Sequence, residues 1–227
     1  MGQDRKEIHM ILADSAGELE DRRSRFLSAL HPVRTEEEAL AFIDAIKKQY
    51  WDARHHCFAY IVEGGRTVRC SDDGEPQGTA GRPILDVLTG AGLQDVVCVV
   101  TRYFGGTLLG TGGLVRAYSG AASDAVKNAE VFTRREGVRL CIRMNYTDLG
   151  KIQYLLGAKN IPIVDSVYAE DVRLRVMIRK DREESLRDEL NEATGARVDY
   201  PEAENVIFAE SQNGHTPRII SEGTMEK

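Results

Sequence analysis

The chain has 227 residues, of which 42% are hydrophobic, 29% charged and 7% aromatic. This composition excludes collagenous, mucin-like and wholly disordered chains, and the length predicts two small domains, each with its own core. The 30 Lys and Arg residues against 36 Asp and Glu residues give a net charge of −6. A uniformly basic coat for nucleic acid is therefore excluded, and a polyanion would have to bind a local patch.

Neither a membrane span nor a secretion signal is apparent in the sequence. The longest apolar runs, such as 96–100, are far shorter than the ~20 residues that a transmembrane helix needs. The first ten residues lack an apolar signal core, so we expect a cytoplasmic protein. The four cysteines are widely spaced and form no CxxC pair, which predicts buried thiols rather than disulfides or a metal site.

The first quarter of the chain alternates strand and helix signals after a polar start. Residues 25–33 have strand character, and Thr35 with Glu38 predicts a helix that begins with a capping box. Residues 56–62 are apolar at both alternating sets of positions, which is typical of a strand covered on both faces. A glycine turn then leads into a hairpin partner at 67–70.

A long unpatterned loop and a glycine-rich segment follow. Residues 71–83 carry acids, glycines and prolines without periodicity, and loops of this length are usually functional or disordered. A short helix is predicted at 84–88 and a buried strand at 95–104. The glycine-rich residues 105–113 then lead into a helix, giving the order strand, glycine loop, helix.

The last third of the chain predicts a second domain with an open sheet face. Its pattern is strand, helix, strand, strand, helix, strand, the ferredoxin-like split βαβ arrangement with both helices on one face. We therefore predict an α+β protein with a first domain at 1–135, a second domain at 136–210 and a loose polar tail at 211–227.

Three motifs in this order resemble the YigZ/IMPACT family: RHHCFAY (54–60), DDGEPQGTAGRP (72–83) and VTRYFGGTLLGTGGLVRAY (100–118). The resemblance covers about half of the chain and implies a first domain similar to the βα domains of some ribosomal proteins and of elongation factor G. It implies a second, ferredoxin-like domain similar to a C-terminal domain of elongation factor G. It also implies a translation-linked or RNA-binding role, with eukaryotic relatives that regulate a translational stress kinase through a partner protein.

The glycine-rich segment is the first candidate site. A helix that opens after such a loop can hold an anion on its free amides, and neighbouring arginines can add phosphate contacts. The segment lacks the ending of a Walker loop and does not match GxGxxG, and its glycines also suit positive φ angles and tight packing. The phosphate or RNA candidates are Arg102, Tyr103, Gly105, Gly106, Gly110, Thr111, Gly112, Gly113 and Arg116.

The acidic loop and the nearby histidines form a second candidate region, facing the first across a predicted cleft. The carboxylates could bind magnesium, but turns and caps explain them better because they lack a coordination spacing, so we expect no metal. A Cys-His nucleophile is disfavoured because His56 and Cys57 point to opposite faces of a strand. We identify no catalytic residues. The cleft candidates are His56, Asp72, Asp73, Glu75, Gln77, Gly78, Thr79 and Arg82.

A set of arginines projects from the predicted open face of the second domain's sheet. Like charges on neighbouring central strands are destabilising unless acids or a ligand offset them. This face lacks stacking aromatics, so contact with an RNA backbone or a protein is favoured over base readout. An equal alternative is that the arginines pair with acids of the same domain or pack on the first domain. The members are Arg139, Arg143, Arg173, Arg175 and Arg179.

The leading functional hypothesis is a non-catalytic translation-linked factor that contacts RNA or the ribosome, without a cofactor. One alternative is an enzyme acting on a phosphorylated small molecule or nucleotide through the glycine-rich loop. Another is a protein-binding regulator with a protein partner. We expect no membrane association, and the sequence does not predict an oligomeric state.

Overall fold

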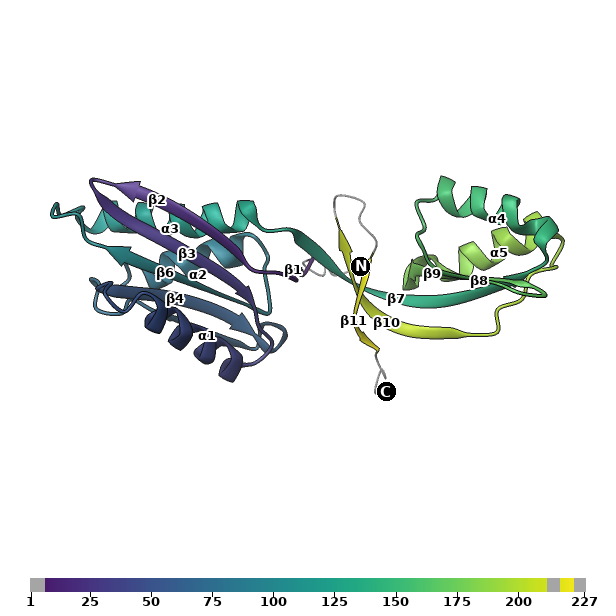
Figure 1. Ribbon diagram of the computed structural model, residues 1–227, viewed down its shortest axis with the longest axis horizontal. Coiled ribbons are helices and arrows are strands. Elements are labelled where there is room, and N and C mark those ends of the chain that lie inside the picture. Colours follow the sequence, from purple (N-terminus) through teal and green to yellow (C-terminus); the bar gives the residue numbers. More distant parts are fainter. Residues whose placement is uncertain (1–6, 212–216, 223–227) are drawn as a thin grey trace, which may run out of the picture. The chain divides into compact units, whose positions relative to one another are not determined.

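The computed structural model describes residues 7–211 and 217–222. The chain divides into two compact units, Met1–Phe132 and Thr133–Lys227. Both combine helices with antiparallel strands (Figure 1). Within the described ranges, no helix has the length and apolarity that crossing a bilayer would need.

A sheet of five antiparallel strands organises the first unit. Its strand order is β2-β3-β6-β4-β5. The central strand β6 pairs with β3 on one side and with β4 on the other, so segments distant in sequence meet at its two edges. The strands are β2 (Ser15–Asp21), β3 (Ser24–Pro32), β4 (His55–Val62), β5 (Thr67–Ser71) and β6 (Val96–Tyr103), and a short β1 (His9–Ile11) precedes them.

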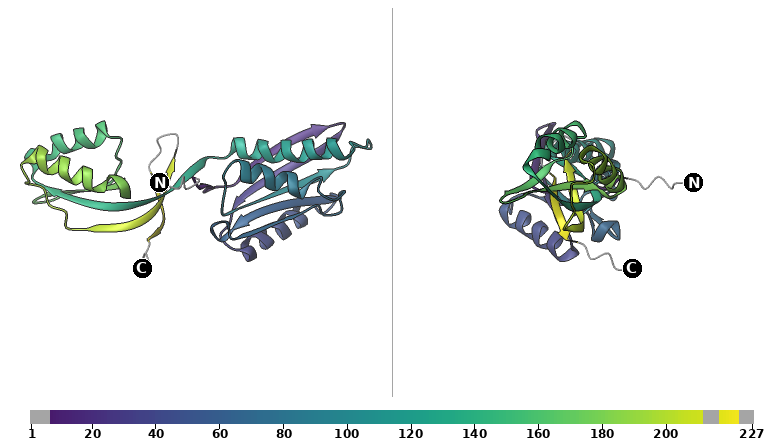
Figure 2. Two further views of the ribbon diagram at one scale, coloured as in Figure 1. Left: turned by 180° about the vertical axis from the view of Figure 1, so that it is seen from behind. Right: turned by 90° about the vertical axis from the view of Figure 1, so that its right-hand side faces the viewer.

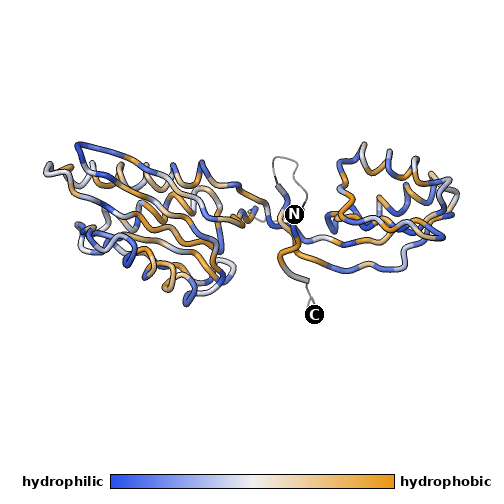
Figure 3. The backbone as a smooth tube through the Cα atoms, viewed as in Figure 1, coloured by the Kyte–Doolittle hydropathy of each residue, from blue (hydrophilic) through white to orange (hydrophobic). Residues whose placement is uncertain are grey.

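Helices cover both faces of this sheet. Helix α1 (Glu36–Gln49) packs on one face, while α2 (Gly81–Gly90) and α3 (Thr111–Asn128) pack on the other (Figures 1 and 2). Strands β4 and β6 are consequently buried on both sides, which confirms the prediction from their continuous apolar sequence. In Figure 3 these central strands are the most hydrophobic part of the unit.

The predicted capping box of α1 is only half formed. The Thr35 hydroxyl accepts a hydrogen bond from the Glu38 amide at 3.3 Å, as expected of an N-cap. The Glu38 carboxylate, however, accepts from the Arg34 amide at 2.6 Å, one residue before the N-cap. The helix therefore starts where the sequence predicts it, but the Glu38 carboxylate accepts from the amide of Arg34 instead of that of the N-cap Thr35.

The second unit has the element order that the sequence predicts. Its sheet has the order β11-β10-β7-β9-β8, and Val138, Leu140, Ile142 and Met144 face a core shared with both helices. The elements are β7 (Val131–Met144), α4 (Tyr146–Ala158), β8 (Ile163–Tyr168), β9 (Val172–Arg179), α5 (Glu183–Thr194), β10 (Ala203–Ser211) and β11 (Arg218–Glu222).

Several details differ from the sequence-based predictions. The polar start contains β1 and β2, and the short helix expected at 84–88 is the longer α2. Residues 218–222 of the predicted loose tail form β11, which pairs with β10. The remaining tail residues, 212–216 and 223–227, lie outside the described residues. Cys70 was expected to be a buried thiol but is exposed, because it lies on the edge strand β5.

Candidate functional site

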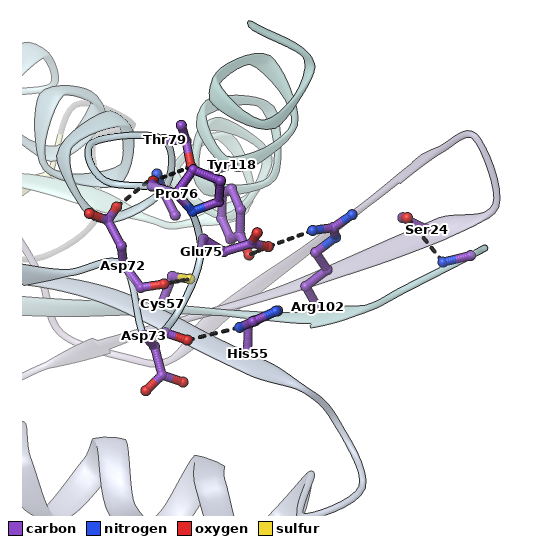
Figure 4. A network of polar contacts seen from close by, with 12 residues as sticks. Ser24, His55, Cys57, Asp72, Asp73, Glu75, Pro76, Thr79, Arg102 and Tyr118 are labelled. Atoms are coloured by element: carbon purple, nitrogen blue, oxygen red, sulfur yellow. Dashed lines mark hydrogen bonds and ion pairs between the residues drawn. The ribbon is translucent and has the colours of Figure 1, made fainter. Parts of the chain in front are cut away.

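A buried polar network connects the acidic loop to the central strand β6. The Arg102 guanidinium lies 2.6 Å from the Glu75 carboxylate, and the two side chains are only 6% and 4% exposed. The Tyr118 hydroxyl on α3 donates a second hydrogen bond to the same carboxylate at 2.8 Å (Figure 4). This network therefore joins the loop, the sheet and α3. Burial raises the pKa of Tyr118, so its hydroxyl stays protonated as a donor.

Asp72 organises the loop that carries Glu75. Its carboxylate accepts hydrogen bonds from the amides of Gly78, Ala80 and Gly81 at 2.8, 3.0 and 2.8 Å. Burial alone would raise the pKa of Asp72, but these three hydrogen bonds outweigh it and hold the pKa below its usual value. Two of these donors, Ala80 and Gly81, lie at the start of α2, so the carboxylate complements the positive end of that helix dipole.

The histidines and Cys57 make separate contacts and form no nucleophile pair. The His55 Nδ1 atom lies 2.8 Å from the Asp73 carbonyl oxygen, and the His56 amide donates to the Asp73 carboxylate at 2.7 Å. The Cys57 thiol donates to the Asp72 carbonyl oxygen at 3.0 Å. Burial raises the pKa of this thiol well above its usual value, so it is a poor nucleophile.

The glycine-rich segment divides between a loop and a helix start. Gly105 passes so close to the β2–β3 turn that a Cβ atom would lie 2.1 Å from the Arg23 carbonyl carbon. Gly110 is the N-cap of α3 with a φ of 71°, a conformation that favours glycine. Thr111, Gly112 and Gly113, which we expected in the loop, form the first turn of the helix.

The amides of this first turn lack a cap. Gly110 has no side chain to offer, and no acidic residue lies in the first turn of α3. Within the described residues, no hydrogen bond is made by the amides of Thr111, Gly112 or Gly113. The N-terminus of this 18-residue helix is therefore open at Thr111 and Gly112, which are exposed, and its positive dipole end can attract an anion.

A cavity of about 450 Å³ lies at this helix start. Arg102 lines it, and its Nε atom is buried without a hydrogen-bond partner within the described part of the chain. The remaining lining residues are polar or charged on one hand (Arg54, His55, Glu75, Thr111) and apolar or glycine on the other (Pro76, Phe104, Leu108, Leu109, Gly110, Leu114).

The cavity brings together only part of the sequence candidates. Arg102, Glu75, Gly110 and Thr111 line it, whereas the other candidates face elsewhere or serve the loop. Gly78 donates to Asp72, the Thr79 hydroxyl donates to the Pro76 carbonyl, Arg82 pairs with Asp86, and the Tyr103 hydroxyl donates to Asp52. The exposed Arg116 and Gln77, with Gly106, His56, Asp72 and Asp73, are not among the lining residues.

Sequence reasoning missed the Arg54 and His55 wall of the cavity. His55 lies directly opposite Arg102 in the register of β4 and β6, which places the start of one strand beside the end of the other. The RHHCFAY motif contains both residues, but nothing in it says which strand it will pair with. The exposed Arg54 has no ion-pair partner within the described ranges.

The second unit's arginines are neutralised by acids of the same unit. Arg143 and Arg173 are register partners on β7 and β9, and Asp171 lies 3.8 and 3.3 Å from them. This arrangement supports the cross-strand pairing alternative. The other pairs are Arg139 with Glu204, Arg143 also with Asp199, Arg175 with Asp165 at 2.7 Å and Glu202 at 3.4 Å, and Arg179 with Asp181 at 3.3 Å.

Comparison with known proteins agrees with this organisation. The Impact N-terminal domain matches residues 22–126, and a domain of unknown function, DUF1949, matches residues 142–197. Together the matches define a two-domain α+β protein with an Impact-type first unit. The IMPACT family member YvyE of Bacillus subtilis is 38% identical over 192 residues, covering 84% of this chain and 88% of that protein. The chain belongs to the IMPACT family.

Two further similarities extend over most of the chain. The IMPACT family member YigZ of Escherichia coli is 38% identical over 162 residues, covering 70% of this chain and 79% of that protein. A solved structure described as a hypothetical protein matches with a TM-score of 0.55 and 32% identity, over 86% of this chain and 96% of the other. The family membership that the three motifs predicted is therefore confirmed over both units.

Proposed function

We propose that this chain is a non-catalytic, translation-linked factor whose first unit contacts RNA. The observation that carries the proposal is the open N-terminus of α3 beside Arg54 and Arg102, because free amides and arginines are typical phosphate contacts. Membership of the IMPACT family supports the translation link, since the motifs of this family imply it.

The second unit fits the same proposal as a scaffold. Its strand order, with β7 and β9 central and β10 and β8 outside them, supports a ferredoxin-like assignment and the implied similarity to a C-terminal domain of elongation factor G. The implied likeness of the first unit to ribosomal-protein domains remains part of the proposal. Because the arginines of this sheet are paired with acids, we assign the RNA contact to the first unit rather than to this sheet.

The chemistry of the cavity favours binding over catalysis. The Glu75 carboxylate is held in an ion pair with Arg102 and accepts a hydrogen bond from the Tyr118 hydroxyl, so it is engaged within the protein. Cys57 does not line the cavity, and its thiol is protonated. Hydrolysis of ATP with a metal requirement by the purified chain would contradict the proposal and support the enzyme alternative.

Co-purification tests the proposal directly. The tagged chain is isolated from a lysate of the cells that naturally produce it, once with and once without nuclease treatment. The RNA and protein that remain bound are then identified. We expect ribosomal RNA or ribosomal proteins that disappear after nuclease treatment. Recovery of a nuclease-resistant protein partner without RNA would instead support the protein-binding alternative.

A further inference from the structure

The cavity at the start of α3 combines a free helix amide with donors from two arginines. The free amide of Thr111 lies on the cavity, and the exposed Gly112 follows it in the same helical turn. Arg54 and Arg102 line the same cavity, and the Nε–H of Arg102 is buried without a partner within the described residues. An internal phosphodiester exposes two non-bridging oxygens and one charge, whereas a phosphomonoester has three acceptor oxygens and a charge of about −1.5 to −2. The donor set therefore fits a terminal phosphate better.

The charge of the lining leads to the same conclusion. Arg102 is balanced by Glu75, while Arg54 has no acidic partner within the described residues. One uncompensated cation remains, and it acts together with the positive end of the α3 dipole. The buried Arg102 Nε is an independent sign of a missing acceptor, because buried donors are rarely left without one.

An apolar wall lies beside this anion-binding end. Phe104 and Leu108 line the cavity and are 45% and 80% exposed, so both side chains are accessible to a ligand. The Arg102 guanidinium lies 5.4 Å from the centre of the Phe104 ring, so that ring sits next to the proposed phosphate position. An aromatic side chain at such a place can stack with a nucleobase.

We propose that the cavity binds a nucleoside monophosphate unit, with its phosphate at the N-terminus of α3 and its base against Phe104 and Leu108. The inference rests on the proposed RNA contact and deepens it: the unit is the 5′-phosphorylated end of single-stranded RNA, not the chain interior. A free mononucleotide offers the same chemistry, and the experiment below separates the two sources.

The test compares two RNA 10-mers of one sequence, one with a 5′-phosphate and one with a 5′-hydroxyl, by fluorescence anisotropy on the full chain. We expect the phosphorylated RNA to bind at least ~10-fold more tightly, as loss of hydrogen bonds to a charged group predicts. AMP and inorganic phosphate serve as competitors. If AMP displaces the labelled RNA as effectively as the same concentration of unlabelled phosphorylated RNA does, the ligand of the cavity is the free mononucleotide.

Variants separate end recognition from general RNA binding. Thr111→Asp places a carboxylate on the first turn of α3, which favours the helix but repels a phosphate, so it should abolish the preference for the 5′-phosphate without lowering Tm. Arg54→Gln should reduce that preference about 10-fold. Gln153→Glu, an exposed change of the same charge in the second unit, should leave it intact.

The outcomes distinguish the two proposals. Equal, salt-sensitive binding of both RNAs would overturn end recognition while leaving the RNA-contacting function standing. Binding of neither RNA would overturn both. A preference that survives Thr111→Asp in a folded protein would overturn the placement of the phosphate at α3.

Discussion

Glu75 and Arg102 form an ion pair of 2.6 Å that is almost completely removed from solvent. One residue belongs to the acidic loop and the other to the central strand of the sheet, so the pair fixes the loop against the core. Two buried charges stabilise each other only while both are present, because an unpaired charge in this environment costs several kcal/mol. This dependence is the basis of the first prediction.

Arg102→Met should lower the free energy of unfolding by about 3–5 kcal/mol, since it leaves the buried Glu75 carboxylate without a compensating positive charge. The double variant Arg102→Met/Glu75→Met should lose much less than the sum of the two single changes. Urea denaturation followed by circular dichroism measures both. Arg82→Met removes an exposed ion pair with Asp86 and serves as the control, with an expected loss below ~1 kcal/mol. Additive losses would contradict a coupled pair.

Two glycines of the same motif should respond in opposite ways to alanine. At Gly105 a Cβ atom would lie 2.1 to 2.5 Å from backbone atoms of Arg23 and Ser24, so Gly105→Ala should destabilise the chain by about 1–3 kcal/mol or more. At Gly112 the nearest atom is the Arg116 side chain at 3.6 Å, so Gly112→Ala should be neutral or stabilise by up to ~1 kcal/mol. Thermal unfolding of both variants tests this, and equal effects would contradict the close approach at Gly105.

The four cysteines should differ in reactivity. Cys70 is exposed, whereas Cys57, Cys98 and Cys141 are buried. Burial raises the pKa of Cys98 to about 12 and raises that of Cys57 further. Iodoacetamide at pH 8 should therefore modify Cys70 alone in the folded chain and all four cysteines in urea, as mass spectrometry can show. Rapid modification of Cys57 in the folded chain would contradict the burial of this thiol.

Asp72 should contribute to stability in a pH-dependent way. Its pKa is lower in the folded chain than the unfolded value of about 3.9, so its contribution is present above about pH 4 and is lost as the pH falls through the folded pKa. Asp72→Asn should cost about 1–2 kcal/mol at pH 7 and progressively less below pH 4. Unfolding measured at several pH values tests this, with the exposed Asp44→Asn as control. A cost independent of pH would contradict the role of the ionised carboxylate.

The arginines of the second sheet should have little influence on RNA binding. Arg143 and Arg173 share Asp171, so their charges are already compensated within the unit. The variant Arg143→Ala/Arg173→Ala should change stability by no more than ~1 kcal/mol per ion pair and leave the salt dependence of RNA binding unchanged. A fall of about two in the slope of log K against log salt would instead show that this face contacts phosphates.

Strong apolar patterns allowed much of the fold to be predicted. Strands β4 and β6 are buried on both faces, and their sequences show it directly. Strand β2 was not predicted. It is an edge strand with the sequence SAGELED, which contains acids and small residues but none of the β-branched or aromatic residues that indicate a strand. Strand β11 depends on pairing with β10, a contact that no local pattern reveals.

The sequence predicted only the part of the candidate site that lies within one continuous segment of the chain. The glycine-rich segment before α3 is local in sequence, so the proposal of an anion site there could be made from the sequence alone. The contribution of Arg54 and His55 required knowing that the start of β4 lies opposite the end of β6. The pairing of the second unit's arginines was weighed as an alternative but needed strand register and turn geometry to be decided.

The two helices on one face of the first sheet differ in what sits at their N-termini. Asp72 supplies the start of α2 with a carboxylate from the protein's own chain, bound by the amides of Ala80 and Gly81 and by that of Gly78 in the preceding loop. Within the described residues, no acidic side chain occupies the first turn of α3. The α2 terminus is thus an intramolecular copy of the complex that α3 would form with an external anion. The contacts of Asp72 can serve as a model for the design of a short peptide or inhibitor that binds the start of α3. In such a ligand a phosphate would replace the carboxylate.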